Sequence, residues 1–411
     1  MKSLVIAEAF PWPTDDGYRL RLANLLGAFL ELGEVDFLCL DGRRRTRDHA
    51  PEGVTVIDAP GGPDRAISSW LRPWLTGSDP RRLLRSDFSE GRRRLETLEQ
   101  SNYDVCFVSH VDCWYPIEDL LTIPTIVDFD NLENLLTRTI REAGPIIEPG
   151  ASVRRRVAAS ARWVVASAFN LVDERRWDSV QRRLANSVDL AFVCSSLDVE
   201  RSGYPNTVVV PNGYERTFEP ADHVELNDST APVFLFVGLM SYDPNSDAVR
   251  RFASAVMPRI RRELPGARFR IVGRNPESVA SLERLDGVEV VGAVDSLEAE
   301  LRGADVAVVP LRAGAGTRLK VVEAMANRLP MVTTSIGCEG IDIVDGVHAW
   351  IRDDDEGIAE ACIEAVRNID ARRSVIDAAE ARYEERYRWE SIRSTVASMA
   401  SSVASEGLRR S

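Results

Sequence analysis

The chain has 411 residues, of which 44% are hydrophobic and 28% charged. This length is roughly two to three times that of a typical domain, and the composition is that of a globular protein, so we expect two domains with large cores. The formal net charge of −13 excludes a basic nucleic-acid-binding module. No apolar run is long enough for a membrane-spanning helix, and the N-terminus lacks the length and cleavage site of a signal peptide.

Cysteine and lysine usage indicate where such a chain works. The six cysteines show no CxxC spacing, which favours a reduced protein of the cytosol. Only Lys2 and Lys320 occur beside 49 arginines. This bias is typical of a GC-rich bacterium, and it makes the single internal lysine a residue of interest.

The first half of the chain alternates strand-length apolar runs with helical patterns. Between the first two runs, apolar residues from Leu22 to Leu32 recur at a spacing of three and four, which predicts one apolar helix face. The runs read as buried parallel strands, and they lie at 4–7, 35–40, 54–57, 105–108, 125–127 and 190–193.

The second half repeats the same alternation. Between two of its strands, a helical pattern runs from Ala248 to Leu264, and we expect Pro258 to kink or restart that helix. The predicted strands of this half lie at 208–210, 233–237, 269–272, 288–291, 306–309, 331–333 and 349–351.

Two successive series of strands and helices predict an α/β protein with two doubly wound, Rossmann-like domains. The polar, turn-rich stretch at 200–230 marks the boundary. We therefore expect domains at 1–205 and 206–385, followed by a helical tail at 386–411. Two arginine-rich segments, 65–94 and 151–172, are either surface helices or elements that bind a membrane surface or an acceptor.

Ligands of such sheets bind beyond the carboxyl ends of the strands, so residues there are the first candidates. Gly17 precedes a helix, where it either lets the backbone approach an anion or forms a plain turn. His110 follows a strand and either binds a sugar hydroxyl or is an ordinary polar group. Asp128 and Asp130 follow the next strand, where they bind a metal, act as a base or cap a helix.

The strongest group of candidates is the segment VVPLRAGAGTRLKVVEAMA, in which a strand, a Gly-rich loop and a helix start succeed one another. Loop amides, the helix dipole, Arg318 and Lys320 converge there, as a pyrophosphate site requires. Glu323 shares a helix face with Lys320 and either pairs with it or binds a ribose diol. The segment does not match the dinucleotide-binding motif, because Leu319 stands where that motif needs Gly or Ala. It does not match a P-loop either, because GxxxxGK[ST] is absent.

In combination, GTRLKVVEAMA, PMVTT, FVGLMSYDPNSDA, IVGRNP, GAVD and VVPNGYE resemble the nucleotide-sugar-binding half of the retaining family 4 glycosyltransferases, the glycosyl transferases group 1. The resemblance implies the GT-B fold, in which two Rossmann-like domains face each other across a cleft and a C-terminal helix returns to the first domain. It also implies that residues 1–205 bind the acceptor and 206–385 the nucleotide-sugar donor.

Residue by residue, the resemblance implies that Arg318 and Lys320 hold the donor diphosphate, that His110 lies near the sugar and that Glu323 binds the ribose. The other expected donor contacts are Gly17, Gly238, Gly273, Arg274, Val294, Gly316, Thr317 and Leu319. Two positions depart from the family pattern: Ala315 stands where many members have a sugar-contacting Glu, and Leu239 where they have a basic residue.

The function that these residues imply is retaining transfer of a sugar from a nucleotide-diphosphate sugar to a natural-product or cell-envelope glycan acceptor. Cationic side chains would stabilise the leaving pyrophosphate, so we expect no metal ion and no cofactor beyond the donor. A non-catalytic partner of an active transferase and a nucleotide-sugar epimerase are the alternatives. We expect the acceptor at Trp70, Trp74 and 154–169 of the first domain, and a cytoplasmic protein with peripheral membrane contact as an option.

Overall fold

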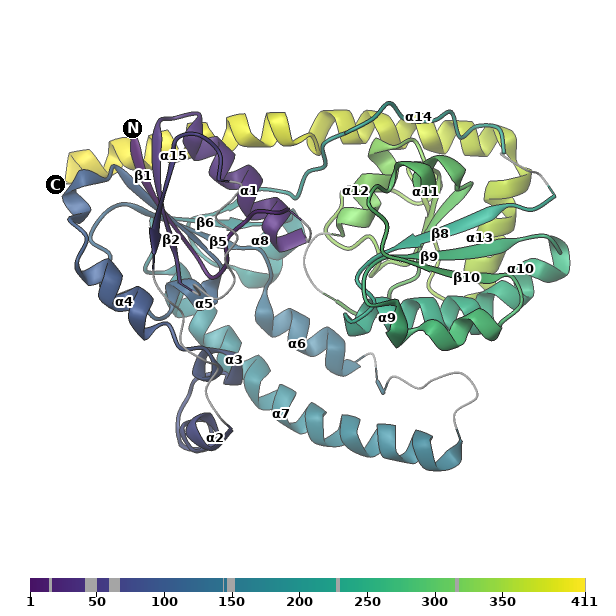
Figure 1. Ribbon diagram of the computed structural model, residues 1–411, viewed down its shortest axis with the longest axis horizontal. Helices are drawn as coiled ribbons and strands as arrows, with labels where there is room; N and C mark the ends of the chain where they lie inside the picture. The colour runs from purple at the N-terminus through teal and green to yellow at the C-terminus, as the bar shows by residue number, and fades with distance from the viewer. Residues whose placement is uncertain are drawn as a thin grey trace. The chain divides into compact units, whose positions relative to one another are not determined.

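The computed structural model describes residues 1–14, 17–40, 50–58, 67–142, 144–145, 152–226, 230–314 and 318–410 (Figure 1). The chain divides into two compact units, each built on its own parallel sheet. The first unit contains Met1–Arg138, Phe169–Asn212 and Trp389–Ser411, and the second contains Thr139–Ala168 and Gly213–Arg388.

The sheet of the first unit has seven parallel strands in the order β3-β2-β1-β4-β5-β6-β7. The chain runs outward from β1 to β3 and then crosses to β4, so the sheet is doubly wound, as predicted. Its strands are β1 (Lys2–Ala7), β2 (Glu34–Cys39), β3 (Val54–Asp58), β4 (Val105–Ser109), β5 (Thr125–Phe129), β6 (Leu190–Val193) and β7 (Thr207–Val209).

Alternate residues of these strands build two cores, one on each face of the sheet. Leu4 and Ile6 pack on one face and Val5 and Ala7 on the other, all without exposure to solvent. The helices that accompany the sheet are α1 (Gly17–Leu30), α2 (Ile67–Thr76), α3 (Arg81–Arg85), α4 (Ser89–Glu96), α5 (Val111–Trp114), α8 (Ser196–Ser202) and α15 (Trp389–Arg410), while α6 (Glu133–Glu142) and α7 (Val153–Ala185) hold residues of both units.

Strand β7 differs from the sequence interpretation, which counted residues 208–210 with the second half. In the structure Thr207–Val209 pairs with β6 and extends the first sheet. Its residues are half-buried or exposed, as expected of a short edge strand. The apolar pattern predicted the strand correctly, but such a pattern does not encode which sheet the strand joins.

The sheet of the second unit is also parallel and doubly wound, with the order β10-β9-β8-β11-β12-β13. Its strands are β8 (Val233–Val237), β9 (Arg268–Val272), β10 (Val288–Gly292), β11 (Val306–Val309), β12 (Met331–Thr333) and β13 (Trp350–Ile351). The helices of this unit are α9 (Asp243–Arg251), α10 (Met257–Glu263), α11 (Glu298–Gly303), α12 (Leu319–Ala326), α13 (Asp355–Arg367) and α14 (Ile369–Arg386).

Pro258 affects its helix as expected. The turn before it, Phe252–Val256, is a π-helix that separates α9 from α10, and Pro258 lies in the first turn of α10. A proline has no N–H and its ring collides with the carbonyl four residues earlier, so the chain widens locally before it.

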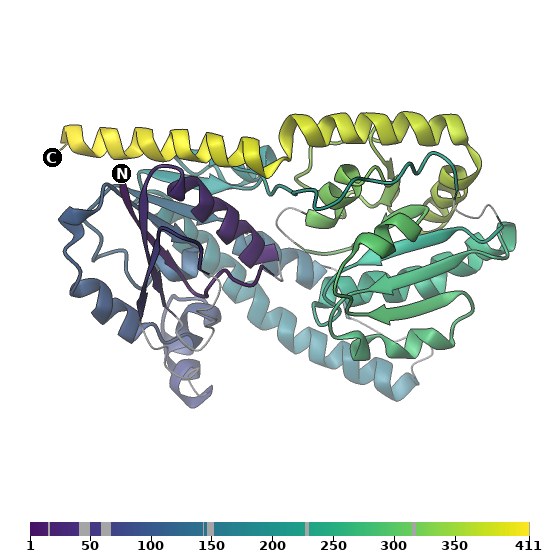
Figure 2. The same cartoon turned by 45° about the horizontal axis from the view of Figure 1, so that its top comes forward.

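The C-terminal helix packs on the first unit, which confirms the prediction of a returning tail. Trp389, Val396 and Ala400 of α15 are buried in the same core as Leu22 and Phe29 of α1. The two helices lie side by side in Figures 1 and 2. The last helix of the sequence is thus part of the first core.

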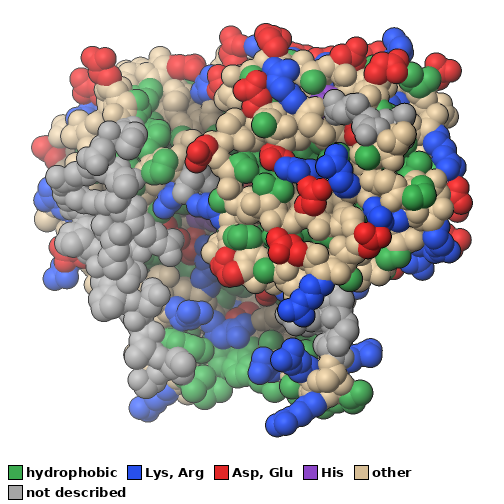
Figure 3. Space-filling model, turned by 45° about the vertical axis from the view of Figure 1, so that its right-hand side comes forward, with side chains coloured by type: hydrophobic (Ala, Val, Ile, Leu, Met, Phe, Trp, Pro, Cys, Tyr) green, Lys and Arg blue, Asp and Glu red, His purple; other side chains and the backbone are tan. Residues whose placement is uncertain are grey.

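The surface agrees with the mixed charge of the sequence. On the face shown in Figure 3, acidic and basic side chains are interspersed, while hydrophobic side chains gather at the lower edge. Within the described ranges, no helix is both long enough and apolar enough to cross a membrane.

Candidate active site

The carboxyl ends of three strands in the second unit are joined by hydrogen bonds between backbone atoms. Gly238 follows β8 and its N–H donates to Val272 O at 3.0 Å, while Gly273 follows β9 and donates to Gly292 O at 2.8 Å. A Cβ on Gly273, whose φ is +143°, would lie 1.7 Å from Gly238 O. Glycine is therefore required for this close approach, and the floor of the candidate site is peptide backbone.

Asn245 on α9 joins this floor to Lys320. Its Nδ2 donates to Leu239 O at 3.0 Å, and its Oδ1 accepts from Lys320 Nζ at 2.7 Å. A Cβ on Gly238 would lie 2.8 Å from Asn245 Nδ2, so the glycine also makes room for the amide. The sequence interpretation did not single out Asn245, although it lies inside the quoted segment FVGLMSYDPNSDA.

Lys320 lies in the first turn of α12 and is withdrawn from water. Its Nζ is 4.2 Å from the centre of the Phe236 ring and bonds the neutral amide of Asn245. Burial, together with the positive charge of Arg318, lowers the pKa of Lys320 to about 7, against the opposing effect of Glu323. A lysine in this state gains from any anion that approaches it.

Arg318 precedes α12 and is 7% exposed. Its Nε donates to Ile336 O at 3.3 Å. The guanidinium lies against Gly314, because a Cβ there would come 3.0 Å from Nη2. The structure thus brings two cationic side chains together at the start of one helix, as the sequence predicted.

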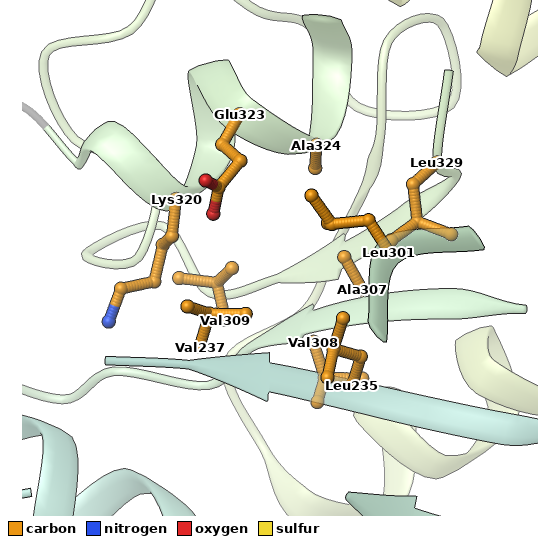
Figure 4. A pocket seen from close by; sticks show the side chains of 10 residues that line it. All are labelled: Leu235, Val237, Leu301, Ala307, Val308, Val309, Lys320, Glu323, Ala324 and Leu329. Atoms are coloured by element: carbon orange, nitrogen blue, oxygen red, sulfur yellow. The ribbon is translucent and has the colours of Figure 1, made fainter. Parts of the chain in front are cut away.

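Glu323 and Lys320 leave the same face of α12 and point towards the strands (Figure 4). Both line a small pocket with Val237, Val309 and Leu329. Burial raises the pKa of Glu323 to about 7, while Lys320 and a hydrogen bond from Tyr214 act to lower it. Tyr214 is a second partner that the sequence interpretation missed, although it lies in the quoted VVPNGYE.

The remaining residues that were predicted to contact the donor differ in how exposed they are. Arg274 is exposed, and its carbonyl accepts from Met240 N at 2.9 Å. Val294, beyond the end of β10, and Leu319, the first residue of α12, are half-buried. Gly316 and Thr317, like Ala315, lie outside the described residues.

The predicted residues of the first unit lie at its own carboxyl edge. Gly17 begins α1. His110 follows β4 with a φ of 75°, and its ring contacts the Tyr18 ring edge-on, with 4.8 Å between the ring centres. His110 Nε2 is 3.6 Å from Asp130 Oδ2, and Nδ1 is 3.9 Å from Asp112 Oδ1. The imidazole is therefore held between carboxylates.

Asp128 is part of a buried ion pair that the sequence did not reveal. Arg21 donates to its two oxygens at 2.8 and 2.6 Å, and to Val210 O and Asn212 Oδ1 at 3.0 Å. Asp128 is 1% exposed, and both of its carboxylate oxygens are engaged by Arg21. Asp130 also faces Asn212, whose Nδ2 is 3.3 Å from Asp130 Oδ1.

Trp74 does not offer the free stacking surface that was expected of it. It is 6% exposed and donates to Asp173 at 2.7 Å, while its ring packs on Phe169 with 4.9 Å between the ring centres. Trp70 is half-buried. Within the described part of the chain, no cluster of three or more His, Cys, Asp or Glu residues could hold a metal ion.

Solved structures that resemble this chain share its fold over almost the full length. Sucrose-phosphate synthase of Thermosynechococcus elongatus matches with a TM-score of 0.70 and 16% identity, covering 99% of this chain and 100% of that chain. HepE of Anabaena, solved with UDP and glucose, matches with a TM-score of 0.63 and 14% identity over 97% and 99%. WaaG, a glycosyltransferase involved in lipopolysaccharide biosynthesis, gives 0.59 and 12% over 97% and 99%.

Sequence comparisons agree with this fold. A curated relative, an uncharacterized 44.6 kDa protein in the cps region of Klebsiella pneumoniae, is 26% identical over 150 residues, and the match spans 34% of this chain and 39% of that relative. Residues 231–368, which contain the cationic group, match the family model of glycosyl transferases group 1. These findings show that the chain has the GT-B-like fold of these solved structures and that its residues 231–368 are similar to the glycosyl transferases group 1.

Proposed function

We propose that the chain is a retaining glycosyltransferase that moves a sugar from a nucleotide-diphosphate sugar to a natural-product or cell-envelope glycan. The observation that carries the proposal is the pair Arg318 and Lys320 at the start of α12. The pKa of Lys320 is lowered by burial and by Arg318, so this site gains most from a doubly charged ligand.

The pair supplies what the transfer step needs. As the bond between the sugar and the β-phosphate breaks, negative charge grows on the leaving pyrophosphate. Cationic donors already held in place stabilise that charge, typically by about 3–4 kcal/mol each. Asn245 holds the Lys320 ammonium by a 2.7 Å bond before any ligand arrives. Transfer then proceeds without a metal ion, because the side chains occupy the place of the metal.

Glu323 is proposed to bind the ribose. Its carboxylate shares the α12 face with Lys320 and is oriented by the hydrogen bond with Tyr214. A carboxylate accepts two hydrogen bonds from a vicinal diol, which fixes the nucleoside relative to the diphosphate. Gly238, Gly273, Arg274, Val294, Gly316, Thr317 and Leu319 remain the proposed further donor contacts.

The donor is proposed to be a uridine nucleotide sugar, with UDP-glucose as the first probe. HepE, which shares the fold, was also solved in complex with UDP-glucose. The acceptor is assigned to the first unit, where His110 is held beside Asp130 and is proposed to contact the transferred sugar. We also propose a cytoplasmic location, where the six free, buried cysteines stay reduced.

A non-catalytic partner of an active transferase is the second candidate. Leu239 favours it, because a side chain that is 36% exposed and apolar stands at the floor of the site where the family pattern has a cation. Hydrolysis or transfer of the donor by the pure chain decides between the two candidates.

The first experiment is a thermal-shift panel of nucleoside diphosphates and nucleotide sugars. A ligand at 100 times its dissociation constant adds about 2.7 kcal/mol to the free energy of unfolding. We expect UDP and UDP-glucose to stabilise the chain, and Arg318→Ala with Lys320→Ala to abolish the shift. A panel in which no nucleotide stabilises the protein would overturn the proposed donor site.

A further inference from the structure

The first twenty residues of α7 carry an apolar surface that the chain leaves in water. Val153, Val157, Val164, Val165, Leu171 and Val172, which we call the valine stripe, are 76%, 62%, 57%, 59%, 42% and 37% exposed. None of the residues 153–172 is buried, whereas Trp177, Val180 and Leu184 of the same helix belong to a core. The C-terminal part of α7 therefore belongs to a core, whereas its first twenty residues do not.

The stripe lies on one side of the helix. Val153, Val157, Val164 and Leu171 are separated by four, seven and seven residues, so their side chains project in nearly the same direction. A helix rises 1.5 Å per residue, so the stripe is roughly 30 Å long. A continuous exposed apolar surface of this kind marks an interaction site.

The charged residues around the valine stripe indicate which kind of partner it fits. Arg154, Arg155, Arg156 and Arg162 are exposed around it, and residues 152–172 contain no Asp or Glu. The net charge of the whole chain is −13, so the positive charge of this segment is opposite in sign to that of the chain as a whole. At the level where α7 lies in Figure 1, Figure 3 shows hydrophobic side chains bordered by Lys and Arg.

We propose that residues 153–172 of α7 dock on an anionic lipid surface, with the valine stripe at the boundary between headgroups and acyl chains and the arginines on the headgroup phosphates. A helix with apolar residues on one face and arginines beside it binds a membrane in this way. The arginines are long enough to keep their charge in the headgroup layer while their stems cover apolar surface.

A second copy of this chain fits the stripe less well. Two such helices packed face to face would bring together four arginines from each copy with no acidic residue between 152 and 172 to neutralise them. Like charges at close range oppose that pairing. An anionic membrane, in contrast, satisfies the apolar and the cationic residues together.

The inference goes beyond the proposed function, because lipid binding needs no turnover and the two therefore fail independently. The test is co-sedimentation of the full chain with vesicles of phosphatidylcholine alone and with about 30% phosphatidylglycerol added. We expect binding only to the anionic vesicles, and weaker binding when salt rises from about 0.1 M to 0.5 M.

Two variants address the two components of the surface. Arg154→Glu with Arg155→Glu and Arg156→Glu should weaken binding by at least about 100-fold, since each basic residue near an anionic surface contributes roughly fivefold. Val157→Ser with Val164→Ser should weaken it by about tenfold, because each loses apolar burial. All five side chains are exposed, so unchanged thermal unfolding and UDP binding show that the variants are folded.

Matched controls exclude general effects of charge and polarity. Arg182→Glu with Arg367→Glu and Arg386→Glu makes the same change in net charge at arginines that are 53%, 53% and 53% exposed elsewhere. Val344→Ser with Val347→Ser alters valines that are 52% and 46% exposed in a turn of the second unit. Both controls should bind the anionic vesicles like the parent chain.

Three outcomes would overturn the proposal. They are equal sedimentation with both kinds of vesicle, retention of binding in the Arg154–Arg156 variant, and equal loss in the charge control. A parent chain that is dimeric in sedimentation velocity and becomes monomeric in the Val157 and Val164 variant would instead assign the stripe to contact between copies.

Discussion

Arg21, which is buried, and Lys320, which is half-buried, show that a cation can be balanced within the chain in one unit and left incompletely balanced in the other. Arg21 is 2% exposed and has a carboxylate, a carbonyl and an amide oxygen within 3.0 Å. Lys320 has the neutral amide of Asn245 at 2.7 Å. The charge of Arg21 is balanced by the carboxylate of Asp128, whereas the ammonium of Lys320 bonds the neutral amide of Asn245.

The pKa directions follow this difference. Burial acts to lower the pKa of Arg21, but Asp128, Cys194 and Asp130 together outweigh burial, and the pKa is raised. For Lys320, burial and Arg318 lower the pKa to about 7 and Glu323 offsets only part of this. A site for an anionic substrate requires a cation whose charge the protein itself balances only in part. A cation that is fully paired within the chain maintains structure instead.

The largest effect is expected at Arg21. Arg21→Ala leaves Asp128 buried without its partner, and breaking such a pair costs about 3–5 kcal/mol of the free energy of unfolding. Urea unfolding measures the loss. The double substitution Arg21→Met with Asp128→Leu is the control, because it removes both charges, and it should recover much of the stability. A loss below about 1 kcal/mol in Arg21→Ala would contradict the assignment.

Lys320→Ala should affect turnover rather than folding. Removing one preorganised charge typically lowers kcat by about 100-fold, while unfolding should change little because Lys320 has no carboxylate bond to lose at Asn245. Steady-state transfer or hydrolysis of UDP-glucose measures it. Arg312→Ala is the matched control, since Arg312 is a neighbouring cation already paired with Asp247 at 2.7 Å. Turnover within threefold of the parent would refute the role of Lys320.

Glu323→Gln should raise the KM for the donor by roughly tenfold, the cost of about one charge-assisted hydrogen bond. Asp130→Asn, in the other unit, should leave the donor KM near that of the parent and act through His110 on kcat. Donor titrations at saturating acceptor separate the two constants. Equal changes in KM would mean that the roles of the two units have been misassigned.

The smallest expected effect is on stability as a function of pH. The folded pKa of Lys320 is about 7, below the value of about 10.4 in an unfolded chain, so the unfolded chain binds more protons between these values and stability rises with pH there. Lys320→Met should remove this rise, by roughly 1 kcal/mol between pH 7 and 9 after solvent screening. Denaturant unfolding at the two pH values compares the variant with the parent. If the stability of the parent and of the variant depended on pH in the same way, Lys320 would have to be exposed to water.

Much of the fold was predictable because it depends on local periodicity. The strands at 233–237 and 306–309 follow from apolar spacing alone, and so does α1, whose buried apolar residues begin at Leu22 and which ends at Leu30. The cationic start of α12 was predictable for the same reason, since Arg318, Lys320 and Glu323 lie within six consecutive residues of the sequence at the start of this helix.

What sequence did not reveal depends on contacts between distant segments. Asn245 lies 75 residues before Lys320 in the chain, and Arg21 lies 107 residues from Asp128. Trp74 read as a surface aromatic, yet Phe169 and Asp173 cover it. In each case the partner is fixed by the packing of whole elements, and no spacing within one segment encodes it.

The backbone floor formed by Gly238, Gly273 and Gly292 restricts how the site can change by substitution. A side chain at Gly273 would collide with the neighbouring strand end, so this surface keeps its shape whatever the surrounding residues become. If this floor meets the donor as proposed, changes of donor preference, in evolution or by engineering, have to arise at the residues that border it, such as Leu239 and Arg274, while the floor itself stays the same.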